Sequence, residues 1–288
     1  MPTCTFARFA SKAKHTGHWS KRTAQNAIAG EITTIDNTLA SDATAITNLQ
    51  ATTATQTTNI TTLQSATRYI TTGTDMNGYP ATFISKCNLW VQDGSGSTSD
   101  GGGALTGLGN VIIGYNEIGS PYGDARTGSH NLIVGLQNSY VSFGGAVMGQ
   151  QNTSSGIFAT VIGGVGNDAS GEYSTVAGGN LSIANGHCSS IFGGSSNTAS
   201  GGFCTVSGGA SNGAIGEYSS VSGGWGNAAR GIYSSITAGS YNNASGQYSS
   251  ITGGTYNTAS GSLSTVSGGQ GLTQASQYGW TGGTHHSP

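Results

Sequence analysis

The chain has 288 residues, of which 50 are glycine and four are proline, and only 7% are charged. Glycine does not recur at every third position, which excludes collagen, and no apolar run is long enough for a membrane-spanning helix. The formal net charge of -2 conceals a basic beginning, because residues 1–70 carry six cations against three anions.

Residues 1–24 form a basic arm, with Phe6, Phe9 and Trp19 among its cations. Such an arm on a nearly neutral body indicates a segment that docks onto another structural protein. The alternative is a solvated, partly disordered terminus. The arm lacks the continuous apolar segment of a secretory signal, and the acidic remainder of the chain disfavours nucleic-acid binding.

Residues 25–70 follow the seven-residue apolar pattern of a coiled coil. Nine of the thirteen a and d positions are isoleucine or leucine, and isoleucine at both positions favours trimers over dimers. These nine are Ile28, Ile32, Ile35, Leu39, Ile46, Leu49, Ile60, Leu63 and Ile70. The many threonines are poor helix formers, so we expect this helix only with partner chains. The alternative, one amphipathic helix packed on its own domain, is disfavoured because about 45 residues at roughly 1.5 Å each outreach a small domain.

The remaining chain changes from irregular to strictly repetitive. Residues 71–104 are expected to form two short strands and a Gly/Ser-rich loop, and 105–155 irregular rungs with loop insertions on one face. Over 156–269 the repeat has a period of fifteen, with glycine at every fifteenth position from 156 to 261. Five residues after each glycine stands a β-branched residue: Val161, Val176, Ile191, Val206, Val221, Ile236, Ile251 and Val266.

This repeat predicts a mainly β fold, a parallel β-roll or β-solenoid with one fifteen-residue rung per repeat. Each rung should have two short strands, a Gly-Gly turn, and a second turn at an asparagine in left-handed geometry. Strand alternation places the Val/Ile column and the small residues two places before it inside. A single roll this thin buries little, which favours three rolls packed together. We expect 270–288 to break the period as a cap, with Tyr278 and Trp280 over the last rung.

Two outward columns are candidate interaction surfaces. The aromatic column includes Tyr173, Tyr218, Tyr233 and Tyr248, and aromatic faces suit surface glycans; packing between chains is the alternative. Hydroxyls at the third and fourth places of each rung, such as Ser174 and Thr175, predict a flat ladder of the kind that ice-binding solenoids use.

Few residues are suited to catalysis or to cofactor binding. His187 follows a rung glycine and is expected as a lone surface histidine. Cys188 and Cys204 should face opposite sides and stay free thiols. The adjacent His285 and His286 would chelate a metal only as a ring of three chains. We therefore expect no enzyme, cofactor or metal site.

The residues 220–224, Asn227, Ala229 and Gly231, with their equivalents in every rung, resemble the head repeats of trimeric autotransporter adhesins, the YadA-like family. The resemblance implies a left-handed parallel β-roll with three chains side by side, well over 156–269 and loosely over 105–155. The period is one residue longer than the usual repeat of that family. The order is also reversed, because the coiled coil precedes the head and no C-terminal β-barrel follows it.

The reversed order resembles the tail and head fibres of bacterial viruses, which dock by the N-terminus and end in a β-structured tip. We therefore expect a non-catalytic homotrimeric fibre for attachment to a surface glycan or protein, on a virion or at a cell surface. A bacterial surface adhesin with a YadA-like head is the first alternative. An ice-binding or other structural β-solenoid is the second.

Overall fold

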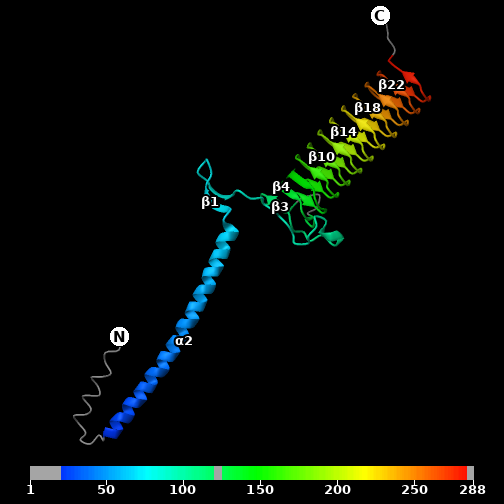
Figure 1. Ribbon diagram of the computed structural model, residues 1–288. Coiled ribbons are helices and arrows are strands. Elements are labelled where there is room, and N and C mark those ends of the chain that lie inside the picture. The colour runs from blue at the N-terminus through cyan, green and yellow to red at the C-terminus, as the bar shows by residue number, and fades with distance from the viewer. Residues whose placement is uncertain (1–20, 120–124, 284–288) are drawn as a thin grey trace. The chain divides into compact units, whose positions relative to one another are not determined.

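The computed structural model describes residues 21–119 and 125–283 and divides the chain into two units, Met1–Leu89 and Trp90–Pro288. The first unit contains the helix α2 (Lys21–Thr67) and an antiparallel hairpin of β1 (Ile70–Thr74) and β2 (Pro80–Ile84). The second is a β-solenoid (Figure 1). Most of the expected docking arm lies outside the described residues. No described helix is long and apolar enough to cross a membrane.

The helix α2 has 47 residues and buries none of them within its own chain. Threonine hydroxyls along it donate to the carbonyl four residues earlier, as Thr33 does to Ala29 at 3.0 Å and Thr57 to Thr53 at 2.9 Å. These bonds satisfy the threonine hydroxyls on the helix itself. The threonine-rich surface therefore needs no polar partner from elsewhere in the protein.

The helix ends at Thr67, so the expected coiled-coil position at Ile70 is wrong. Ile70 is the first residue of β1 and pairs with Ile84 of β2. The β-branched run from Ile70 to Thr72 favours extended backbone, and the hairpin supplies its hydrogen bonds. Eight of the nine expected positions remain on the helix.

The solenoid is built from two parallel sheets that run along its length, with strands of the two sheets alternating in the sequence. The 12-stranded sheet comprises β3 (Val111–Ile113), β4 (Leu132–Leu136), β6 (Ala146–Gln150), β8 (Thr160–Val161), β10 (Thr175–Val176), β12 (Ser190–Ile191), β14 (Thr205–Val206), β16 (Ser220–Val221), β18 (Ser235–Ile236), β20 (Ser250–Ile251), β22 (Thr265–Val266) and β24 (Trp280–Thr281). The 10-stranded sheet comprises β5 (Ser139–Tyr140), β7 (Thr153–Ser154), β9 (Asp168–Ala169), β11 (Ile183–Ala184), β13 (Thr198–Ala199), β15 (Gly213–Ala214), β17 (Ala228–Ala229), β19 (Asn243–Ala244), β21 (Thr258–Ala259) and β23 (Thr273–Gln274). A short 3-10 turn, η1 (Asp100–Gly102), precedes β3, the first strand of the solenoid.

The solenoid core is a narrow seam between the two sheets. All eight residues of the Val/Ile column are buried, as are the alanines of the facing return strands. The register pairs each residue with its equivalent one rung away, for example Val206 with Val221 and Ala214 with Ala229. Identical side chains therefore stack directly on one another and leave little room for larger residues.

The asparagine column is also inside the solenoid, which corrects its expected place in a left-handed turn. Asn227 donates through Nδ2 to the carbonyls of Gly223 at 3.0 Å and Gly239 at 2.8 Å. Its Oδ1 accepts from the backbone amide of Asn242, one rung on, at 3.0 Å. The positive φ instead falls on the preceding residue, such as Tyr241 at 53°. The asparagines thus connect neighbouring rungs by hydrogen bonds to the turn backbone, in addition to the backbone bonds there such as that from the Trp225 amide to the Gly239 carbonyl at 3.0 Å.

The rungs have two lengths, and one glycine accounts for the difference. Ala146 pairs with Thr160, fourteen residues on, whereas Thr160 pairs with Thr175, fifteen residues on. The shorter rungs turn at a single glycine, Gly149, where the longer ones have the pair Gly163 and Gly164. A Cβ on Gly163 would meet open space, but on Gly164, at φ +84°, it would collide with the carbonyl oxygen of Gly179. Only the second glycine of each pair is therefore required by the fold.

The period continues past residue 270, so the expected break there is absent. The strand β23 pairs with β21, and β24 pairs with β22, in the same register as earlier rungs. The last rung differs in its interior: Gln274 replaces the core alanine and Thr281 the core valine. Their side chains hydrogen-bond at 2.7 Å. A polar interior suits a rung whose outer side has no further rung to cover it among the described residues.

A buried column of serines provides a test of core packing. Its members are Ser174, Ser189, Ser219, Ser234, Ser249 and Ser264, and within the described ranges no hydrogen-bond partner meets their hydroxyls. The first regular rung has Ala159 at this place. An unpartnered buried hydroxyl costs free energy that a methyl group does not.

We expect the Ser234→Ala substitution to leave the free energy of unfolding unchanged or to raise it by about 1 kcal/mol. Urea denaturation followed by circular dichroism measures this. A loss of about 1 kcal/mol or more would show that the hydroxyl has a partner in solution, such as a buried water.

Candidate functional site

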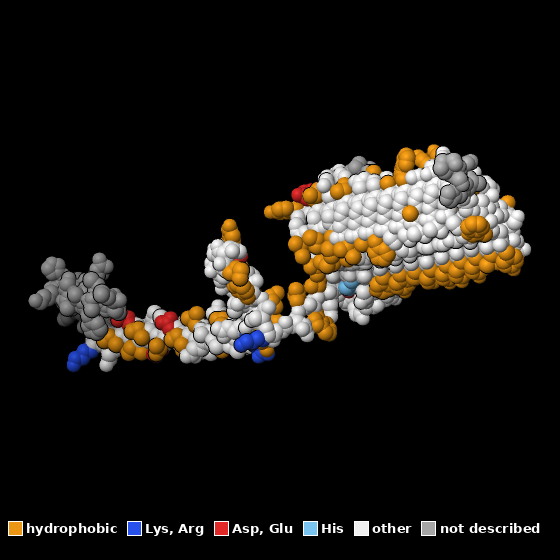
Figure 2. All heavy atoms as spheres, turned by 90° about the horizontal axis from the view of Figure 1, so that it is seen from above, with side chains coloured by type: hydrophobic (Ala, Val, Ile, Leu, Met, Phe, Trp, Pro, Cys, Tyr) orange, Lys and Arg blue, Asp and Glu red, His pale blue; other side chains and the backbone are white. Residues whose placement is uncertain are grey.

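The most extended candidate surface is an apolar stripe on α2, which we define as Ile28, Ile32, Ile35, Leu39, Ile46, Leu49, Ile60 and Leu63. These side chains are 53–66% exposed, and hydrophobic side chains lie along part of the helix in the space-filling view (Figure 2). A shallow hollow lies beside Ile46, Leu49 and Thr53, where a threonine takes a core position. A stripe of this length that no described side chain covers makes this face of α2 a candidate interaction surface.

A second surface is the aromatic column of the solenoid, where the expected tyrosines meet ring to ring. Tyr218 stacks on Tyr233 with ring centroids 4.7 Å apart, and Tyr233 stacks on Tyr248 at 4.9 Å, with interplanar angles of 4° and 2°. Phe203 continues the stack below Tyr218, and Tyr173 stacks on Phe158. Close packing raises the pKa of Tyr233 above its ordinary value, first by loss of hydration and then by the neighbouring phenols.

The stacking changes what this aromatic ladder can bind. Each ring face is covered by the next ring, so only ring edges and hydroxyls point outward. The expectation that the tyrosine faces stack on sugars therefore loses its geometric basis. Hydrophobic side chains form a continuous band along one edge of the solenoid (Figure 2), which suits contact with another apolar surface.

His187 belongs to the aromatic ladder and is not the lone surface residue that was expected. Cys188 occupies the aromatic place of its rung, which would interrupt the ladder. The His187 imidazole fills this gap, with its centroid 5.8 Å from the Tyr173 ring and 5.2 Å from the Phe203 ring, both edge to face. The contacts of the ladder thus extend from Phe143 to Tyr248.

The ladder residues also adopt backbone angles that the sequence did not indicate. Phe158, Tyr173, Tyr218, Tyr233 and Tyr248 have φ between 54° and 59°. This left-handed geometry costs an aromatic residue about 1–2 kcal/mol relative to glycine. Ring stacking contributes about 0.5–1.5 kcal/mol per pair, which offsets most of that cost.

A shorter second ladder lies at the other turn, and sequence reasoning missed it. Trp225 meets Tyr241 at 4.7 Å, and Tyr241 stacks on Tyr256 at 5.0 Å. The place of Tyr241 and Tyr256 holds glycine, leucine or serine in the earlier rungs, and Trp225 stands one place earlier in its own rung, so no column was visible. Inspection of the rung alignment for isolated aromatic runs would have found it.

The expected hydroxyl ladder is only half present on the surface. The serines at the third place of each rung, including Ser174, Ser219 and Ser249, are buried. Only the fourth place, such as Thr175, faces outward. A single mixed column of serine and threonine is not the flat two-column array expected for ice binding.

The three cysteines among the described residues differ in their surroundings: Cys87 is exposed, and the Cys188 Sγ lies 3.9 Å from His187 Nε2. Cys87, Cys188 and Cys204 are free, and Cys204 is buried, which raises the pKa of its thiol to about 11. A thiol of this kind stays protonated at neutral pH and is a poor nucleophile. His285 and His286 lie outside the described residues.

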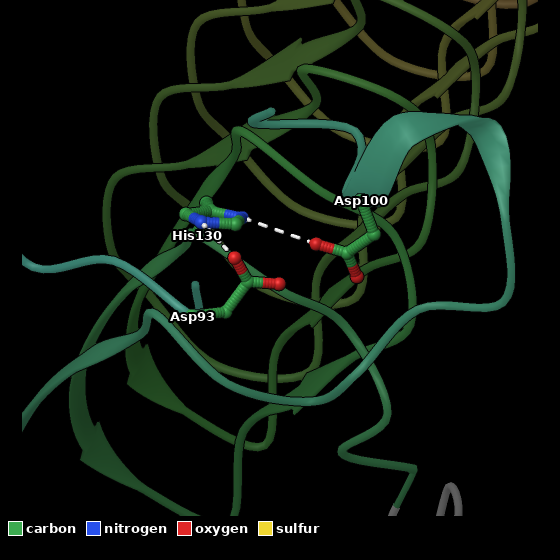
Figure 3. A group of neighbouring side chains, drawn as sticks. All are labelled: Asp93, Asp100 and His130. Carbon is green, nitrogen blue, oxygen red and sulfur yellow. Dashed lines mark ion pairs between the residues drawn. The ribbon is translucent and has the colours of Figure 1, made fainter. Parts of the chain in front are cut away.

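One cluster of titratable side chains brings together residues that are distant in the sequence. Asp93, Asp100 and His130 converge at the start of the solenoid (Figure 3). The amide and hydroxyl of Ser95 hold the pKa of the Asp93 carboxyl well below its usual range. Asp93 lies in the loop before η1, Asp100 is the first residue of η1, and His130 lies between β3 and β4. No sequence motif therefore links the three residues.

Comparison with known proteins leaves the chain without an assigned family. No protein-family model matches it, and no curated protein is similar enough to count as a relative.

Proposed function

We propose that this protein is the subunit of a homotrimeric attachment fibre without enzymatic activity. The observation that carries the proposal is the apolar stripe on α2, which no described part of the chain covers. The fifteen-residue rungs support it, because they resemble YadA-like heads, in which three rolls pack side by side.

The stripe accounts for self-association in energetic terms. Moving each half-exposed isoleucine or leucine into a helix–helix core contributes roughly 1 kcal/mol or more. Isoleucine at both heptad positions favours three strands. Because α2 is rich in threonine, its helical state depends on this association.

The solenoid also has exposed apolar side chains that association would cover. Its core column consists of valine and isoleucine facing alanine, while larger apolar side chains such as Phe192 and Trp225 are 60% and 51% exposed. Packing of three solenoids covers this surface, whereas a single one leaves it in water. A trimer would therefore cover the exposed apolar side chains of both units.

The proposed role is attachment at a virion or cell surface, with the basic arm docked onto another structural protein. A distal glycan or protein receptor would be bound by three copies at once, which raises apparent affinity by about 10²–10⁴ over one copy. The order of coiled coil before β-roll favours a virus-like fibre. The form of the rungs keeps a bacterial surface adhesin as the second candidate.

The proposal is tested by incubating the fluorescently labelled chain with a panel of bacterial cells. We expect at least one cell type to retain the full chain, and a variant that cannot trimerise, Leu49→Glu, to bind at least tenfold less. Equal retention of both proteins, or no retention on any cell type, would contradict attachment by a trimer.

A further inference from the structure

The cluster of Asp93, Asp100 and His130 places two carboxylates around one imidazole. Asp93 Oδ1 lies 3.4 Å from His130 Nε2, and Asp100 Oδ1 lies 3.6 Å from His130 Nδ1. Both aspartate side chains are 1% exposed, and the histidine side chain is 13% exposed. Among the described residues, His130 is the cationic partner that lies against both carboxylates, and the two carboxylates also lie close to each other.

Other hydrogen bonds orient the carboxylates and leave one oxygen without a partner. Asp93 accepts from the Ser95 amide at 2.8 Å and from the Thr106 hydroxyl at 2.9 Å. Asp100 Oδ2 accepts from the Thr106 amide at 2.7 Å and from the Ser129 hydroxyl at 2.6 Å. Asp100 Oδ1 is buried, has no hydrogen-bond partner and points toward the imidazole (Figure 3).

With both carboxylates ionised, the charges in this cluster do not balance without a metal cation. A neutral imidazole has a single N–H, so its other nitrogen would direct a lone pair at a carboxylate oxygen. Two desolvated carboxylates are also costly unless they are paired or coordinate a metal. An imidazolium would supply only one positive charge against two negative ones.

We propose that Asp93, Asp100 and His130 bind a divalent transition-metal cation of the zinc class. Each residue offers one ligand atom, and the three atoms lie within 4.8 Å of one another. Tetrahedral ligands at roughly 2.0–2.2 Å from zinc stand about 3.4 Å apart. Because Asp93 and Asp100 face different nitrogens of the ring, one carboxylate must turn toward the nitrogen that holds the metal to complete the site. The imidazole favours zinc over calcium and magnesium, which prefer oxygen ligands. Water completes the coordination.

The position of the cluster assigns the metal a structural role. His130 precedes β4, the second strand of the 12-stranded sheet, and Asp93 and Asp100 lie in the Gly/Ser-rich loop before β3. Gly109 packs against the imidazole so closely that a Cβ there would lie 2.7 Å from the ring. A bound cation would thus fasten the loop 90–108 to the segment that leads into β4.

Equilibrium dialysis of the chelator-treated full chain with Zn²⁺ or Ca²⁺ tests the proposal. We expect one Zn²⁺ per chain that is lost in His130→Gln and weakened at least tenfold in Asp100→Asn. Asp75→Asn, which changes a hydrogen-bonded carboxylate in the hairpin, is the matched control and should bind normally. The double substitution His285→Gln and His286→Gln should also bind normally, because the proposed ligands lie elsewhere.

A second readout does not depend on the variants folding. In the unmodified chain, Zn²⁺ should slow amide hydrogen exchange over 90–108 at least tenfold and leave exchange over 200–260 unchanged. Absence of Zn²⁺ binding at millimolar concentration would overturn the proposal, as would zinc retained by His130→Gln. Binding of Ca²⁺ as tight as that of Zn²⁺ would contradict the proposed imidazole nitrogen ligand. If the His130 ring carries a proton on both nitrogens in the presence of Zn²⁺, the cluster is an ion pair between an imidazolium and the two carboxylates and holds no metal.

Discussion

The Leu49→Glu substitution is expected to weaken trimer formation at least about 100-fold. Leu49 lies in the middle of the apolar stripe and is 66% exposed in the single chain. In a three-helix core the substitution would bring three carboxylates together without partners, at a cost of about 3 kcal/mol or more per chain. Since 1.4 kcal/mol corresponds to tenfold in affinity, the mass measured by light scattering at micromolar concentration should fall toward 28.7 kDa.

The matched control introduces the same charge one residue earlier. Asn48 lies beside Leu49 in the sequence but outside the a and d positions, so Asn48→Glu should leave the mass of the assembly unchanged. Loss of helical circular dichroism should accompany loss of mass only for Leu49→Glu. If both variants keep the mass of the unmodified chain, the stripe does not hold the chains together.

The Gly224→Ala substitution is expected to be strongly destabilising, whereas its neighbour Gly223→Ala is nearly neutral. Gly224 has φ +93°, and a Cβ there would collide with the carbonyl oxygen of Gly239 in the next rung. A left-handed alanine costs about 1–2 kcal/mol, and relief of the collision should bring the total to about 3 kcal/mol. A Cβ on Gly223 meets nothing within 4 Å, and Ala238 already occupies the equivalent place.

Urea denaturation of both variants beside the unmodified chain measures this difference. Because rungs of a solenoid contact only their neighbours, hydrogen exchange should rise first in the rungs that flank residue 224. Equal stability of Gly223→Ala and Gly224→Ala would contradict the described packing of the Gly-Gly turn.

The repeat architecture was predictable because its determinants are local and recur in every rung. Glycine at each fifteenth position, the β-branched column five residues later and strand alternation were sufficient to indicate the two sheets and the buried Val/Ile seam. The length of the shorter rungs was less visible, since it depends on one glycine, Gly149, in place of a pair. The continued period after 270 was hidden because Gln274 and Thr281 replace apolar core residues.

The features that the sequence alone places wrongly depend on competition between two local patterns or on contacts between residues that are distant in the sequence. Ile70 satisfies both the heptad and the strand pattern, and hairpin pairing with Ile84 decides between them. Asparagine is a common turn residue, yet here its amide lies inside and bridges rungs. Left-handed backbone geometry at the tyrosines depends on ring stacking between rungs, which the conformational propensity of a single residue does not include. The cluster of Asp93, Asp100 and His130 has no motif because its members meet only after the loop closes.

The most direct test of the trimer is the mass of the unmodified full chain by sedimentation equilibrium. The proposed association of the apolar stripe and of the thin solenoid predicts three times 28.7 kDa, independent of concentration in the micromolar range. A stable species of 28.7 kDa would contradict the account. It would mean that the stripe on α2 remains in water and that the solenoid is stable alone.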